Sequence, residues 1–317
     1  MSPWLLILLA PVIIIAMLWI MLERSLKPGK STRAFWSLSP LPFFKKLEGY
    51  IYGSRPHWYL KPATWSWFMK PGRPESADSY HGKVLTGTDA VKLVSLNQAV
   101  ELRNLEHVVP YPLARDIIME QPRSLVAMRC PCREQKKDGC QPREVCLVVG
   151  EPFASFAVEH QPGRARFIDL DEALDILKSE EERGHIHTAW FKDAMHNRFY
   201  CICNCCSCCC LGMKSFERGA PRLTHSGYLP RLDEEECSAC GVCSTVCPFS
   251  AAVRDEERPY FDLEKCMGCG LCVSHCPATA LTLELAPHKG IPLSIDRLVQ
   301  EETNGLDRLS KGKGIPR

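Results

Sequence analysis

The sequence lacks the motifs by which most enzymes bind an organic cofactor. It contains no Gly-x-Gly-x-x-Gly, no Walker A loop and no Gly-x-Ser-x-Gly, so catalysis on a nicotinamide, flavin or nucleotide is not expected. Cys-x-x-Cys-His is also absent, which argues against covalent haem. The net charge is only +2, with no concentrated basic face, so nucleic acid is not an expected partner.

Cysteine, by contrast, is abundant. The chain has nineteen cysteines, an odd number, and most of them lie one to three residues apart, where the geometry for disulfide bridging is poor. Metal-bound thiolates in a reducing compartment explain this pattern better than disulfides do.

Eight of the cysteines form two copies of the pattern Cys-x2-Cys-x2-Cys-x3-Cys-Pro, over residues 237–248 and 266–277. This run binds paired [4Fe-4S] clusters, and the fourth cysteine of each copy ligates the other cluster. The predicted ligands are Cys237, Cys240, Cys243 and Cys276 for cluster one, and Cys266, Cys269, Cys272 and Cys247 for cluster two. Structural zinc is the alternative, although four-thiolate zinc sites use two separated pairs rather than a triplet plus one.

Residues 229–284 therefore resemble a bacterial-type two-cluster ferredoxin domain. The resemblance implies one-electron transfer and a fold of two similar halves, each with a cluster loop, a short helix and strands. Residues 258–262 and 280–284 are predicted strands, and residues 250–253 a helical turn. Between Asp233 and Glu284 the module has ten acidic residues and three basic ones, which would steer it toward a basic partner; a solvated acidic surface is the alternative.

The N-terminal segment suggests a membrane anchor. Residues 3–22 carry no charge, and a helix of this length at ~1.5 Å per residue spans about 30 Å, the thickness of a bilayer core. A cleaved signal peptide is the alternative, but a basic n-region and an Ala-x-Ala site are missing. Lysine and arginine follow the segment and do not precede it, so the positive-inside rule places the bulk of the chain in the cytoplasm.

The predicted fold class is α+β, with a mostly helical middle domain. Residues 112–120 and 169–183 are predicted helices. The aromatic and basic residues between 35 and 68 suit either a membrane-facing segment or a packed N-terminal subdomain. We expect a transmembrane helix at 1–22, a juxtamembrane segment and linker at 23–75, the Cys-rich middle domain at 76–228, the ferredoxin domain at 229–284 and a tail at 285–317.

The middle domain holds the other eleven cysteines. No packing argument requires seven cysteines in ten residues, so further metal binding is predicted. They could supply two more cubes with three thiols to spare, a single cube, or one cluster of unusual type. Cys205 and Cys206 cannot face one metal unless the backbone turns, because neighbouring side chains of a strand point to opposite faces. The candidate ligands are Cys130, Cys132, Cys140, Cys146, Cys201, Cys203, Cys205, Cys206, Cys208, Cys209 and Cys210.

The order of these segments resembles a group of larger bacterial and archaeal iron-sulfur proteins. In that group a Cys-x-Cys-Arg segment, here at 130–133, precedes a Cys-Asn-Cys-Cys segment, here at 203–206, and a terminal two-cluster domain. The resemblance implies clusters but no assigned reaction. Arg133 is expected either to tune a nearby cluster or to form a surface salt bridge. His185 and His187 are expected either to serve as metal ligands or proton donors, or to lie exposed in a loop.

These features together predict a membrane-anchored, cytoplasmic electron-transfer protein with two [4Fe-4S] clusters and one or two further iron-sulfur clusters. The expected partners are the membrane bilayer and a redox protein or membrane oxidoreductase complex. Two alternatives remain: an iron-sulfur oxidoreductase subunit that binds a substrate at a metal site in the middle domain, and a redox or cluster sensor.

Overall fold

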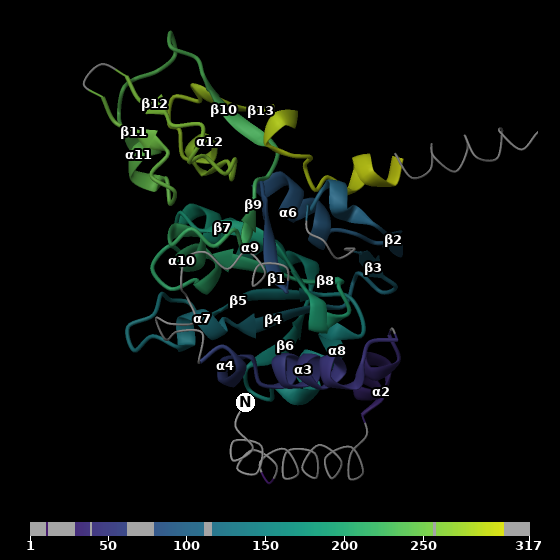
Figure 1. The fold of residues 1–317 in the computed structure, drawn as a ribbon. Coiled ribbons are helices and arrows are strands. Elements are labelled where there is room, and N and C mark those ends of the chain that lie inside the picture. Colours follow the sequence, from purple (N-terminus) through teal and green to yellow (C-terminus); the bar gives the residue numbers. More distant parts are fainter. Residues whose placement is uncertain are drawn as a thin grey trace, which may run out of the picture.

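A seven-stranded sheet forms the centre of the molecule (Figure 1). The computed structural model describes residues 29–38, 40–61, 79–110, 116–255 and 258–300, together with Pro11. Neighbouring strands of the sheet are antiparallel, except for the parallel pair β1 and β9. In spatial order the strands are β6 (Ala165–Ile168), β4 (Leu125–Arg129), β5 (Glu144–Val149), β8 (Phe199–Cys205), β7 (Ile186–Lys192), β1 (Tyr80–Leu85) and β9 (Leu223–Thr224).

The two faces of this sheet are buried in two separate hydrophobic cores. In β5, Val148 belongs to one core and Val149 to the other, and in β8 Cys201 and Ile202 divide in the same way, as the two-residue period of a strand requires. The first face is covered by α2 (Lys30–Ser37), α3 (Phe43–Ser54) and α8 (Phe153–His160), and the second by α6 (Gly87–Val94) and α9 (Leu170–Glu182). The cysteines of β5 and β8 lie on the first face.

Short elements connect and flank these layers. β2 and β3 form a separate antiparallel pair, and α7 and α10 follow cysteine-containing loops. These elements are α4 (Pro56–Tyr59), β2 (Val100–Leu102), η2 (Leu105–His107), β3 (Ile117–Met119), α7 (Pro131–Glu134), η3 (Asp193–Met195) and α10 (Leu211–Glu217).

The C-terminal module lies at one end of the sheet domain, at the top of Figure 1. Two small antiparallel sheets frame it: β10 (Tyr228–Leu232) with β13 (Leu281–Leu285), and β11 (Ala252–Val253) with β12 (Tyr260–Phe261). The helices are α11 (Val242–Val246), α12 (Leu271–Ser274) and η4 (Pro287–Lys289). The two strand predictions are confirmed to within two residues. The helical turn predicted at 250–253 is wrong, because two of its residues pair with β12.

The prediction of a mostly helical middle domain is wrong. Its core is the seven-stranded sheet, whose inner strands are apolar on both faces and so carry no clear two-residue alternation. The helix predicted at 112–120 is also wrong, because its described part contains β3; residues 111–115 lie outside the described ranges. The helix at 169–183 is confirmed as α9. Asp169 caps it by accepting a hydrogen bond from the Glu172 amide at 2.8 Å.

The predicted fold class is also corrected at the N-terminus. Within the described ranges, no helix is both long and apolar enough to cross a bilayer. The span expected at residues 3–22 falls outside those ranges, apart from Pro11. The dominant element of the described part of the chain is a sheet between two helical layers.

The aromatic segment after residue 29 packs on the first face of the sheet. Phe35 is fully buried and Tyr50 nearly so, and Phe35 stacks on Phe156 of α8 with ring centroids 4.8 Å apart. Phe44 and Trp58 remain exposed. Of the two expectations for this segment, the packed subdomain describes α2 and α3.

A buried lysine in β1 makes stability depend on pH. Lys83 is fully buried and donates to the His225 carbonyl at 2.6 Å. Burial lowers its pKa to about 7 from an ordinary 10.5, although Asp89 opposes the shift. Between these two values the unfolded chain binds more protons than the folded one, so the folded state gains stability as pH rises.

We expect Lys83→Met to remove this dependence. The advantage of the variant over the wild type should be largest near pH 7 and should shrink toward pH 10, by at most about 1.4 kcal/mol per pH unit. Urea unfolding at pH 7, 8 and 9 measures it, with the exposed Lys178→Met as the control. Parallel profiles for the Lys83 variant and the wild type would contradict the prediction.

Candidate metal centres

The C-terminal module contains two small cavities, each lined by four cysteines. One cavity, of about 20 Å³, is lined by the first set: Cys237, Cys240, Cys243 and Cys276. The other, also of about 20 Å³, is lined by the second: Cys247, Cys266, Cys269 and Cys272. These are the crossed groups that the spacing predicts, and four convergent thiols fit the iron atoms of one cube. The assignment of each cysteine as a ligand stays a prediction.

Glycines shape both cluster loops. Gly241 and Gly270 have φ angles of 76° and 87° and directly precede α11 and α12. Such left-handed conformations are readily adopted by glycine. The turns bring the cysteines before each helix close to those within it. Burial raises the pKa of Cys272 to about 12, so its thiolate needs a bound cation to form at neutral pH.

A larger cavity of about 60 Å³ lies on the first face of the sheet domain. Its remaining walls are mostly apolar and aromatic, and they include Tyr52, Tyr80, Tyr200 and Trp190, which the sequence reasoning missed. The cysteines that line it are Cys130, Cys132, Cys146, Cys201, Cys203, Cys205, Cys206 and Cys210. The structure thus brings together eight of the eleven candidate ligands of the middle domain.

The strand β8 explains this convergence. Cys201, Cys203 and Cys205 are alternate residues of β8, so their side chains share one face. Cys201 and Cys203 place their Sγ atoms 3.8 Å apart. Hydrogen bonds from Cys146, Cys201 and Cys205 hold the pKa of Cys203 well below its usual range. The alternating Cys-x-Cys-x-Cys pattern is the sequence feature that indicates a strand here, because it has the two-residue period of a strand.

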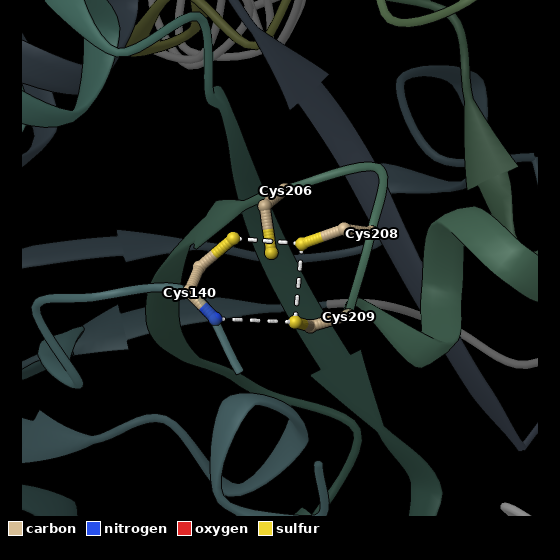
Figure 2. A group of neighbouring side chains, drawn as sticks. All are labelled: Cys140, Cys206, Cys208 and Cys209. Carbon is tan, nitrogen blue, oxygen red and sulfur yellow. Dashed lines mark hydrogen bonds between the residues drawn. The ribbon is translucent and has the colours of Figure 1, made fainter. Parts of the chain in front are cut away.

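A second cysteine group lies beside the cavity, where β8 ends (Figure 2). Its four Sγ atoms, from Cys140, Cys206, Cys208 and Cys209, all lie within 4.8 Å of one another. The Sγ of Cys208 is 2.7 Å from that of Cys140 and 3.1 Å from that of Cys209. We call this group the surface tetrad, since Cys208 is exposed.

The backbone turns at 207–209, directly after β8. Cys205 therefore contacts Cys203 and Cys210 on the cavity side, whereas Cys206 joins the surface tetrad. Because β8 ends at Cys205, Cys206 lies outside the strand; it lines the large cavity as well as joining the surface tetrad.

The spacing in the surface tetrad suits a single metal ion. In a tetrahedral zinc site with Zn–S bonds of ~2.3 Å, the sulfur atoms lie about 3.8 Å apart. A [4Fe-4S] cube places four irons and four sulfides between its thiolates and needs a wider set. The tetrad can therefore hold one zinc ion as a closed, structural site.

Replacement of Cys208 by serine should remove about one zinc ion per chain and leave the iron content unchanged. Cys208 is exposed, so the fold should tolerate the change. Metal analysis of the anaerobically purified protein measures both elements, and Ser207→Ala in the same turn is the matched control. Loss of iron from the Cys208 variant, with no change in zinc, would contradict this assignment.

Arg133 lies between the two cysteine groups and is fully buried. Its guanidinium pairs with Glu180 and donates to the Asn204 carbonyl at 3.1 Å. Its positive charge also lowers the pKa of Cys203 and opposes the rise in the pKa of Cys206 that burial causes. The alternative of a surface salt bridge is therefore wrong.

The histidines after α9 are less exposed than a loop position would imply. His187 is 3 % exposed, and its Nδ1 lies 2.6 Å from Asn204 Oδ1. His185 Nδ1 lies 2.7 Å from a Glu180 oxygen. Both rings thus belong to the polar network around Arg133, and neither lines the large cavity.

The fold and the cysteine cavities define an iron-sulfur protein. Residues 229–289 match the family model of the 4Fe-4S dicluster domain, which covers less than a fifth of the chain. This module carries two [4Fe-4S] clusters, and the chain has an iron-sulfur electron-transfer role. No curated protein matches the sequence.

Proposed function

We propose that the chain is an electron-transfer protein whose dicluster module exchanges single electrons with a further metal centre in the sheet domain. The observation that carries the proposal is continuous packing between the two parts. Met267 and Leu271 of the cluster-two loop belong to the same buried core as Cys146, Cys205 and Cys210. Cluster two would therefore sit next to the core that surrounds the large cavity.

Specific contacts hold this arrangement in place. Phe216 of α10 and Phe249, two residues after Cys247, meet edge-to-face at 5.9 Å between ring centroids. The Ser226 amide donates to the Met267 carbonyl at 3.1 Å, and its hydroxyl donates to the Gly268 carbonyl at 2.7 Å. Fixed contacts of this kind support electron exchange without a docking step.

Cluster one is the more exposed of the two and suits contact with an external redox partner. Cys240 is exposed, and the four acidic residues 233–236 immediately precede its loop and are exposed as well. A basic protein surface would be attracted to this site. The proposed path runs from the partner to cluster one, then to cluster two, then to the sheet domain. The identity of the partner and the cytoplasmic location stay predictions.

The test is freeze-quench EPR after mixing the anaerobic protein with less than one equivalent of dithionite. In the wild type, the electron should distribute between the dicluster module and the sheet-domain centre. In Cys272→Ser, which removes a proposed ligand of cluster two, reduction of the sheet-domain centre should slow at least tenfold. Cys208→Ser in the surface tetrad is the control. An unchanged rate in the Cys272 variant would overturn the proposed path.

A second candidate function is an oxidoreductase that reduces a small molecule at the sheet-domain centre. The Tyr52 and Tyr200 hydroxyls lie 2.5 Å apart at the wall of the large cavity. Burial raises the pKa of Tyr52 far above its usual range, so the phenol keeps a proton that a reduction could use. Addition of azide or a small thiol should then change the EPR signal of this centre and leave the ferredoxin signals unchanged.

A further inference from the structure

We propose that six cysteines of the sheet domain bind one metal-sulfur cluster that is larger than a [4Fe-4S] cubane. The inference rests on the proposed function, because it specifies the centre with which the dicluster module exchanges electrons. It also decides among the arrangements that the eleven cysteines left open.

The six thiols form a closed ring. Each side chain interacts with two others of the set, and the last contact returns to the first residue. In the order of these contacts the ring is Cys130, Cys132, Cys210, Cys205, Cys203 and Cys146. All six side chains also line the same cavity, so these thiols converge on one centre rather than on two.

Four separate segments bring the ring together. Cys203 and Cys205 come from β8 and Cys146 from β5, while Cys130 and Cys210 directly precede α7 and α10. The described segments that contribute ligands are strands and helix starts. Cys201, next to Cys203, is a seventh thiol at the edge of the ring. In the folded chain these elements therefore set the relative positions of the ligands.

The two cavities of the dicluster module serve as an internal measure of size. Each is lined by four cysteines and has a volume of about 20 Å³. The cavity in the sheet domain has a volume of about 60 Å³ and is lined by eight cysteines. It therefore has more space and twice the thiols of a cubane site in the same chain, so it can hold a group larger than a single cubane.

The surroundings suit an anionic cluster held away from water. All six ring thiols belong to the buried core of the first sheet face or pack against it. Uncompensated thiolates would be costly in such a place, so metal cations have to balance them. Arg133 is fully buried next to Cys132, and its Nε has no hydrogen-bond partner among the described residues. An N–H donor near cluster sulfur is a recognised way to raise a reduction potential.

The surface tetrad does not belong to this centre. Cys140, Cys208 and Cys209 are absent from the walls of the large cavity, and only Cys206 touches both sites. Variants of the ring and of the tetrad should thus have separate effects. This separation provides the matched control for the experiment.

The experiment is a metal count on the full chain, purified anaerobically. The double variant Cys146→Ser/Cys203→Ser should lose more than about four irons per chain relative to the wild type, because a cubane holds four. Cys208→Ser should lose no iron. The EPR signals of the ferredoxin pair should persist in both variants. Native mass spectrometry of the wild type gives the total metal and sulfide independently of how the variants fold.

The outcomes are distinct. A loss of more than four irons supports the larger cluster if the wild-type mass agrees. That mass should exceed the mass expected with only the two ferredoxin clusters by the same amount of metal, together with its sulfide. A loss of four irons or fewer, or a wild-type mass that accounts for only two or three cubanes, overturns it. If the Cys272→Ser variant, which lacks a ligand of cluster two, reduces the large cluster as fast as the wild type does, the proposed function is contradicted. This inference would then still hold.

Discussion

Replacement of Arg133 by methionine should lower the free energy of unfolding by about 3–5 kcal/mol, because removing one partner of a buried ion pair leaves the other charge in a medium of low polarity. Glu180 is 1 % exposed. Among the described residues its carboxylate would keep only His185 and the half-exposed Arg183 as partners. The side chain of methionine has a similar reach but supplies neither the charge nor the donors. Burial and pairing therefore make the stability of the sheet domain sensitive to this substitution.

Chemical denaturation followed by tryptophan fluorescence measures the effect, since Trp190 is buried in the same core. Arg166→Met is the matched control. Arg166 also binds two carboxylates, those of Glu144 and Glu172, but this network is half-exposed and contributes little. If both variants lost the same stability, the cost would arise from losing an arginine rather than from burying an unpaired Glu180. Arg133→Met should also lower the reduction potential of the sheet-domain centre.

Gly268→Ala should abolish cluster two and remove about four irons per chain. Gly268 has a φ angle of 66°, and a Cβ atom there would lie 2.1 Å from the Tyr228 carbonyl oxygen and 2.3 Å from Ser226 Oγ. The first contact is with backbone, which cannot rotate away. The loop would have to shift, and it carries Cys266 and Cys269.

Gly219→Ala separates this clash from ordinary backbone strain. Gly219 has a φ angle of 82°, but no heavy atom lies within 4 Å of a Cβ atom built there. A left-handed alanine costs about 1–2 kcal/mol by itself, so this variant should be mildly less stable and keep all its iron. Iron and sulfide analysis together with EPR compares the two. Full iron content in Gly268→Ala would show that the loop accommodates the methyl group.

The sequence was most informative where ligand spacing is local. The two cluster loops are short and repeat one cysteine spacing. The prediction of [4Fe-4S] ligands therefore follows from residues three or four positions apart. Helix α9 was also predictable, because an Asp169 cap, an apolar stripe and the Gly184 stop all fall within one segment. The acidic character of the module likewise follows directly from its amino-acid composition.

The sheet and the large cavity depend on contacts that no local pattern specifies. Cys130 and Cys210 are eighty positions apart, and only the pairing of β5 with β8 and β4 brings their segments together. Strands buried on both faces lack the polar alternation that identifies a strand. The burial of Arg133 was unpredictable for the same reason, since its partner Glu180 lies on α9, forty-seven residues away.

The depth of the thiol ring also imposes an order of maturation. All six ring cysteines lie between residues 130 and 210, and the dicluster module that packs against their core is made later in synthesis. Iron and sulfide have to reach the ring before β5, β8 and the module close over it, because a finished interior has no room for an assembly factor. Insertion of the inorganic core would thus be a folding step, and cells short of iron would accumulate an open, protease-sensitive chain.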